Sequence, residues 1–267
     1  YAMMVLGSVG RGESLLAMDQ DNAIVFAEGE PESANDRWFA ALGGHAAAIL
    51  HEVGVPLCKG GVMAREPGFR GSVDTWLARL ETWLSRSDPA DLLNVDIVFD
   101  ARTVHGDARL MHDLLLRFRK AAAANPPFLK LMIASHSHAA PPLGLFGGLK
   151  GDADGRIDLK KHVLSGVVAA ARVLALRGAR AERGTLARLA AAGSDGRGSP
   201  AELTRLAEAF RLAQALVLRA QLADIGGGAK PDNRVPLSLV RPDEKAELKQ
   251  ALALAPVLEE IVRSAAF

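Results

Sequence analysis

The 267-residue chain has little cysteine, no long apolar segment and almost no net charge, and each shortage excludes a class of protein. A single cysteine, Cys58, rules out an internal disulfide and fits a reducing, cytoplasmic compartment. No apolar run reaches the roughly 18 residues of a membrane helix, because Arg172 and Arg177 interrupt the best candidate. A formal charge of +1 provides no general attraction to nucleic acid or to an anionic membrane.

The chain starts in a predicted strand. Residues 1–6 are apolar and lack the charged beginning of a signal peptide. A chain that opens directly in a strand is expected to be a piece of a longer protein with further domains upstream.

The stretch from Gly7 to Asp21 combines a glycine-serine turn with a pair of aspartates. Such a turn, leading into a predicted short helix, presents backbone N–H groups to phosphate, and Ser8 and Arg11 add a hydroxyl and a cation. On a following strand, Asp19 and Asp21 would share one face about 6–7 Å apart and repel by about 2–3 kcal/mol. Mg²⁺ prefers such carboxylates together with phosphate oxygens. The combination indicates nucleotidyl transfer.

Two other interpretations of this stretch are open. Gly7 to Ser14 also fits the phosphate-loop pattern G-x-x-x-x-G-x-[ST], but Glu13 stands in the lysine position and would repel phosphate. The simplest alternative is an ordinary glycine-rich turn followed by a solvated acidic strand.

A third acidic strand is predicted over residues 94–100. Apolar side chains at positions 95, 97 and 99 alternate with Asp96 and Asp100. An aspartate opposite an apolar strand face indicates a further metal carboxylate. A plain exposed edge strand is the competing interpretation.

The rest of the chain is predicted to be mainly helical. Ser33 or Asn35 can cap a helix ending near Val53, and Ser72 can cap another ending near Ser85. The fold class that follows is an α/β domain with a small mixed sheet, over residues 1–122, and an all-helical domain, over residues 123–267. Further helices are predicted over residues 106–124, 127–138, 157–177, 184–192, 200–224 and 242–265, with no convincing strand after residue 125.

Several isolated motifs have both a functional and a structural interpretation. Cys58 has no motif histidine and is expected to be a buried structural thiol. The His112-Asp113 dipeptide lacks the further motifs of metal-dependent phosphohydrolases. His136 and His138, two positions apart on a helix, would not face one ligand.

Two motifs of the second half are left open. Lys160, near the start of a long predicted helix, could reach a triphosphate or be solvated. Asp232-Asn233 could contact a base, a ribose or an acceptor, or could simply form a turn.

Gly7-Ser8, ten intervening residues and Asp19-x-Asp21 resemble the signature of the DNA polymerase β nucleotidyltransferase superfamily. The strings GSVGRGE and DQDNAIVF resemble a narrower bacterial group, found behind cyclic-nucleotide-binding or CBS sensor domains. That group is similar to the nucleotidyltransferase part of PII-protein uridylyltransferase. Val9 and Met18 depart from it where more polar residues are expected. Further matching segments cover nearly the whole chain: residues 58–64, Trp76, Trp83, residues 99–102, 157–160 and 231–233.

The resemblance implies transfer of a nucleoside monophosphate from an NTP to a hydroxyl of a protein or small molecule in bacterial signalling, with release of pyrophosphate. It implies a two-metal Mg²⁺ site in which Asp100, with Asp96 as the fallback, adds the third ligand to Asp19 and Asp21. The helical domain would bind substrate, and the near-neutral charge argues against nucleic acid. A catalytically idle nucleotide-binding regulatory module is the alternative. The residues assigned to the nucleotide are Gly7, Ser8, Arg11 and Lys160.

Overall fold

The computed structural model describes the chain except for residues 86–88, 135–140, 145–147, 255–257, 259 and 261–267. The chain divides into two compact units. The first contains Tyr1–Ser14 and Met18–Phe128, and the second contains Leu15–Ala17 and Leu129–Phe267. Among the described residues, no helix has both the length and the apolar character needed to span a bilayer.

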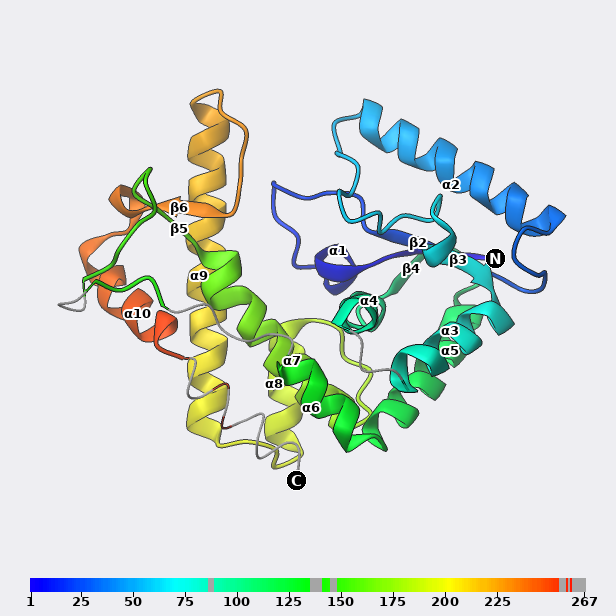
Figure 1. Ribbon diagram of the computed structural model, residues 1–267. Coiled ribbons are helices and arrows are strands. Elements are labelled where there is room, and N and C mark those ends of the chain that lie inside the picture. The colour runs from blue at the N-terminus through cyan, green and yellow to red at the C-terminus, as the bar shows by residue number, and fades with distance from the viewer. Residues whose placement is uncertain (86–88, 135–140, 145–147, 255–257, 259, 261–267) are drawn as a thin grey trace. The chain divides into compact units, whose positions relative to one another are not determined.

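A four-stranded mixed sheet forms the centre of the first unit (Figure 1). The strand order is β3-β2-β1-β4; β1 is antiparallel to β2 and β4, whereas β2 is parallel to β3. Strand β1 confirms the strand predicted over residues 1–6. The bounds are β1 (Ala2–Val5), β2 (Asn22–Phe26), β3 (Arg70–Ser72) and β4 (Arg102–Gly106).

The helices of the first unit begin largely where capping residues predict. The Ser33 hydroxyl accepts a hydrogen bond from the Asp36 N–H at the start of α2, and the Ser72 hydroxyl accepts one from the Thr75 N–H at the start of α3. The helices and the short 3₁₀ turn are α1 (Gly7–Arg11), α2 (Ala34–Glu52), η1 (Pro67–Phe69), α3 (Val73–Ser85), α4 (Pro89–Val98), α5 (Ala108–Ala123) and α6 (Pro126–Ala134).

Aromatic side chains fix these helices to the sheet. Phe39 of α2 stacks on Phe26 of β2, with ring centroids 4.6 Å apart. Trp76 of α3 is fully buried, and its indole N–H donates to the Ile24 carbonyl at 3.0 Å. Figure 1 shows α2 over one face of the sheet and α3 and α5 over the other. Trp83 of α3 is also buried.

The prediction of a strand over residues 94–100 is wrong, because residues 94–98 belong to α4. The buried apolar side chains are Val95, Val98 and Phe99, a spacing of three and four that a helix also produces. Pro89 occupies the first helical position, where proline is favoured. The strand lies immediately downstream instead, as β4.

The second unit is mainly helical, with one small sheet. Strands β5 (Arg156–Asp158) and β6 (Arg234–Pro236) pair antiparallel, with Ile157 opposite Val235. Both of these side chains are buried, which explains the pairing, and the prediction of no strand in this half is therefore wrong. The other elements are the π-helix η2 (Lys160–Leu164), α7 (Ser165–Arg177), α8 (Thr185–Ser194), α9 (Pro200–Gly226), η3 (Leu237–Leu239) and α10 (Pro242–Leu252).

The predicted fold class, a small mixed sheet with helices followed by a helical region, is confirmed. The compact units change at Phe128, within α6, a few residues after the domain boundary predicted at residue 122.

Candidate functional site

The glycine-serine turn lies directly against Asp21. Gly7 has a φ of +53°, in the left-handed region that favours glycine, and it begins α1. The Leu6 N–H donates to the Asp21 carbonyl at 2.9 Å. A Cβ atom on Gly7 would approach Asp21 Oδ2 to 3.1 Å. Glycine therefore allows the carboxylate to lie close to the backbone of the turn.

Asp19 and Asp21 precede β2, so the prediction that both lie on the strand is wrong. The two nevertheless come together. One ligand atom from each, together with the Cys58 sulfur, lies within 4.8 Å of the others. Gln20 between them is buried, and its amide donates to backbone carbonyls of the same unit at 2.8 and 3.0 Å. These hydrogen bonds fix the position of Gln20, and the carboxylates of Asp19 and Asp21 on either side of it lie close together.

The segment from Pro56 to Ala64 runs alongside the acidic pair. The Gln20 N–H donates to the Pro56 carbonyl at 3.1 Å, and the Asn22 N–H donates to the Val62 carbonyl at 3.0 Å. The Asn22 side-chain oxygen also accepts from the Ala64 N–H at 2.9 Å. The backbone on both sides of Asp21 is thus bound to the segment that carries Cys58.

Cys58 is half-buried, where the sequence predicted a buried structural thiol. Burial, reinforced by a hydrogen bond to Asp21, raises the pKa of the thiol to about 11. At neutral pH the sulfur is therefore protonated and acts as a hydrogen-bond donor to Asp21. Its proximity to the acidic pair depends on a tertiary contact, and the sequence signal that includes this residue is the family resemblance of residues 58–64.

The chemistry of these donors fits a hard divalent cation. Mg²⁺ binds carboxylate, water and phosphate oxygens, and it commonly takes only one or two carboxylates from the protein. Asp19 and Asp21 could supply those two. A protonated thiol is a poor ligand for such an ion.

Arg11 is held by two carboxylates. Its Nε lies 2.6 Å from Glu13 Oε2, and its Nη1 lies 2.5 Å from Asp100 Oδ2. The Arg11 side chain is 11% exposed and that of Asp100 is 0% exposed. Among the described residues, the cluster of ligand atoms around Asp19 does not include Asp100. Its role as a third metal ligand stays a prediction.

In the described part of the chain, none of the remaining predicted residues belongs to the cluster of ligand atoms around Asp19. Asp96, the fallback for the third carboxylate, is buried on α4. His112 and Asp113 are exposed on α5. His136 and His138 lie outside the described residues.

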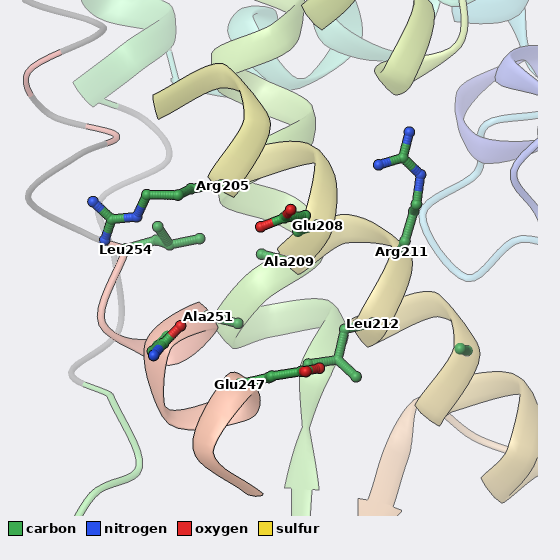
Figure 2. Close-up of a pocket in the computed structure, with 10 residues that line it drawn as sticks. Arg205, Glu208, Ala209, Arg211, Leu212, Glu247, Ala251 and Leu254 are labelled. Carbon is green, nitrogen blue, oxygen red and sulfur yellow. The ribbon is translucent and has the colours of Figure 1, made fainter. Parts of the chain in front are cut away.

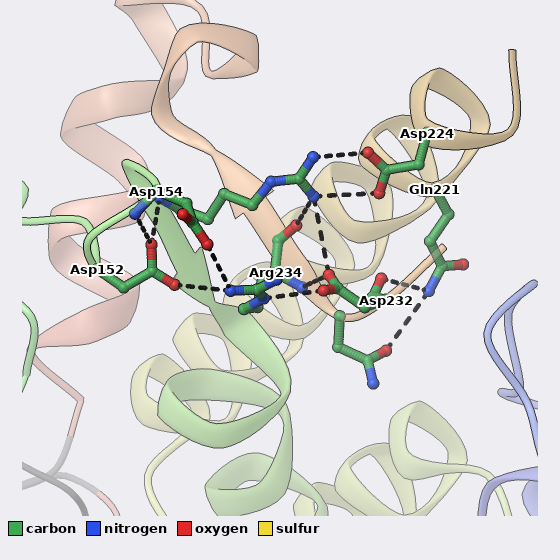
Figure 3. A network of polar contacts seen from close by, with 8 residues as sticks. Asp152, Asp154, Gln221, Asp224, Asp232 and Arg234 are labelled. Carbon is green, nitrogen blue, oxygen red and sulfur yellow. Dashed lines mark hydrogen bonds and ion pairs between the residues drawn. The ribbon is translucent and has the colours of Figure 1, made fainter. Parts of the chain in front are cut away.

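Lys160 and the Asp232-Asn233 dipeptide belong to the second unit. Lys160 is exposed at the start of η2. The Asp232 carboxylate accepts from the backbone N–H and the Nε of Arg234, at 2.7 and 2.8 Å, and Gln221 donates to the Asp232 carbonyl (Figure 3). These contacts are those of a turn fixed between β6 and α9.

Further ion pairs extend this turn into a network (Figure 3). Arg156 of β5 makes a forked contact with Asp224 of α9, at 2.7 and 3.1 Å. Arg234 also reaches Asp152 and Asp154, at 3.3 and 3.1 Å. The forked guanidinium contact holds the pKa of Asp224 below its usual range. The network joins the small sheet to α9.

A pocket of about 600 Å³ lies between α9 and α10 (Figure 2). Its polar lining combines Arg205, Glu208 and Arg211 from α9 with Glu247 and Gln250 from α10. Charges of both signs line it, so no single class of ligand follows from its chemistry.

Comparison with known families gives two matches that together cover most of the chain. Residues 1–90 match the family described as "Putative nucleotidyltransferase DUF294". Residues 126–266 match the one described as "Putative nucleotidyltransferase substrate binding domain". A comparison with curated proteins gave no match.

Proposed function

Because the chain belongs to the DUF294 family of nucleotidyltransferases, we propose that it moves a nucleoside monophosphate from an NTP to an acceptor hydroxyl. The observation that carries this proposal is the convergence of Asp19 and Asp21 beside the Gly7 turn. It joins a carboxylate pair suited to Mg²⁺ with a backbone turn suited to phosphate.

The proposed reaction is a single displacement at phosphorus. The acceptor oxygen forms a bond to the α-phosphorus, and the bond between that phosphorus and the oxygen bridging to the β-phosphate breaks. Pyrophosphate leaves with the bonding electrons, and the hydroxyl proton passes to solvent or to a site carboxylate. Bound Mg²⁺, in a two-metal arrangement, would supply charge neutralisation on the reacting phosphates.

The chain's own groups would bind and orient the nucleotide. Asp19 and Asp21 would hold the metal, and the Gly7 and Ser8 amides with the Ser8 hydroxyl would bind phosphate oxygens. Arg11 would contribute a directed hydrogen bond to phosphate. Lys160 of the second unit is a further candidate for phosphate binding.

The acceptor is proposed to be a protein side chain or a small molecule in bacterial signalling, with uridylyl or adenylyl transfer as the specific reaction. The second matched family, described as substrate binding, supports assigning acceptor recognition to residues 126–266. We also propose that sensor domains precede this chain in the full-length protein and that the protein is located in the cytoplasm.

Pyrophosphate release tests the proposal. The chain is incubated with each NTP, Mg²⁺ and candidate acceptors, and label transfer is followed together with pyrophosphate. Wild type should release pyrophosphate, and an Asp19→Asn/Asp21→Asn double variant should lose at least about 100-fold in rate, because both metal carboxylates are gone. Equal turnover by the double variant would overturn the proposal.

One observation favours the alternative, a module that binds nucleotide without transferring it. Asp100, the expected third carboxylate, pairs with Arg11. Calorimetry with NTP, with and without Mg²⁺, separates the two functions when combined with the pyrophosphate assay. Metal-dependent binding without pyrophosphate release, for every acceptor tested, would support the module.

A further inference from the structure

The turn that follows α4 packs directly against α1. A Cβ atom on Gly10 would come within 2.2 Å of the Asp100 carbonyl oxygen and 2.9 Å of the Val5 carbonyl oxygen. No other residue could let the two backbones approach so closely. Gly10 is buried, so this contact is part of the interior of the first unit.

Side chains of the same turn bind the residues on either side of Gly10. Asp100 Oδ2 accepts from Arg11 Nη1, and Arg102 Nη2 donates to the Val9 carbonyl at 3.3 Å. Three consecutive residues of α1 are therefore in contact with the Phe99–Arg102 turn. The Phe99-Asp-Ala-Arg102 motif, found in the sequence but assigned only a metal carboxylate, fixes the helix that begins at Gly7.

We propose that Asp100 is a positioning residue that acts on the nucleotide through Arg11. Asp100 binds the guanidinium at Nη1 and Glu13 binds it at Nε, which fixes the plane of the group. Nη2 of Arg11 makes no hydrogen bond to a described residue. Its N–H groups could therefore donate to a phosphate oxygen. This proposal rests on the proposed nucleotide site.

The charges around Arg11 define how it would act. Two carboxylates surround one guanidinium, so the group carries no net positive charge toward a phosphate. Its contribution is a hydrogen bond in a fixed direction, which depends on the partners that hold it. A metal ligand role for Asp100 would instead place a metal ion on one of its two carboxylate oxygens.

Two measurements on the whole chain distinguish these roles. Mn²⁺ affinity of the nucleotide-free protein, measured by electron paramagnetic resonance, reports the metal site. The affinity for UTP or ATP with Mg²⁺, measured by calorimetry, reports the nucleotide site without requiring turnover. The variants are Asp100→Asn, Arg11→Gln, their combination, and Asp19→Asn/Asp21→Asn as the control for metal loss.

A positioning role predicts that Asp100→Asn binds Mn²⁺ within about 3-fold of wild type, whereas the Asp19→Asn/Asp21→Asn control loses binding. Asp100→Asn and Arg11→Gln should each weaken nucleotide binding by about 10-fold, and the combination should weaken it no further, because both act through one hydrogen bond. If Asp100→Asn does not fold, Arg11→Lys, which keeps the charge but not the fork, should show the same pattern.

Three results would overturn the inference. Loss of Mn²⁺ binding in Asp100→Asn would make Asp100 a metal ligand, and multiplicative effects in the combined variant would make the two residues independent. Wild-type Mn²⁺ and nucleotide affinity in Arg11→Lys would also contradict it. Failure of the proposed transfer reaction would give another result, in which the variants bind nucleotide as predicted but the wild type releases no pyrophosphate. A wild type that binds no nucleotide would overturn both.

Discussion

Cys58 lies next to Asp21 because the residues before and after Asp21 are hydrogen-bonded to the Pro56–Ala64 segment, which contains Cys58. The sulfur is the only cysteine sulfur of the chain, and it lies beside the proposed metal carboxylates. Its environment disfavours the thiolate, because burial and the neighbouring carboxylate both raise the pKa. Partial exposure therefore does not make this thiol reactive.

Cys58 should resist thiol reagents. A pKa of about 11 against the ordinary 9.0 lowers the thiolate population at pH 8 by about 100-fold, and alkylation should slow accordingly. Asp21→Asn removes one cause of the shift and should speed the reaction. The rate is measured with a chromogenic disulfide, and the urea-unfolded chain serves as the control. Folded and unfolded chains reacting at one rate would contradict the assignment.

The sequence predicts part of this site and not the rest. Asp19 and Asp21 are two positions apart, so local geometry brings their side chains to one side in an extended segment. The Arg11–Asp100 pair spans 89 positions and requires the packing of α1 against a distant turn. The Cys58 contact likewise depends on the path of a loop, which no periodicity encodes.

Among the elements, α2 and α3 were predictable because capping residue and apolar periodicity agree. Residues 94–100 were not, since their apolar positions fit both a strand and a helix, and tertiary packing decides between the two. The short strands β5 and β6 escape prediction for another reason. Three residues are too few to show a period, and their pairing joins segments that are far apart in the chain.

Two adjacent glycines in α2 should respond oppositely to alanine. A Cβ on Gly43 would come within 2.8 Å of the Ala64 carbonyl carbon and the Arg65 nitrogen, whereas a Cβ on Gly44 would meet nothing within 4 Å. Gly43→Ala should destabilise the first unit by about 1–3 kcal/mol, and Gly44→Ala should stabilise it by about 0.5–1 kcal/mol. Urea unfolding measures both. Equal midpoints for the two variants would show that α2 packs differently.

At the scale of the whole molecule, several arginine–carboxylate pairs of the second unit make its stability sensitive to acid. Asp195 beside Arg180 and Asp224 beside Arg156 have pKa values below the ordinary range. Glu244 is buried, and both of its oxygens accept from Arg219, at 2.7 and 2.8 Å. That forked contact lowers the pKa of Glu244 from 4.5 to about 2.

The second unit should lose stability on acidification. A carboxylate with a depressed pKa stabilises the folded state above its unfolded value, and that contribution disappears as pH falls from about 4.5 toward about 2. Glu244→Gln should lower the melting temperature at neutral pH and flatten its decline over this window. Asp243→Asn, whose parent side chain is 72% exposed, is the matched control. Calorimetric scans giving parallel curves for wild type and Glu244→Gln would contradict the prediction.

The placement of the aromatic residues gives the molecule a built-in optical label. Trp38, Trp76 and Trp83, which are all the tryptophans of the chain, lie in the first unit, and so does its only tyrosine. Intrinsic fluorescence therefore reports the first unit alone, whereas far-ultraviolet circular dichroism also records the helices of the second. Two spectra from one cuvette can consequently follow the unfolding of each unit without cutting or labelling the chain.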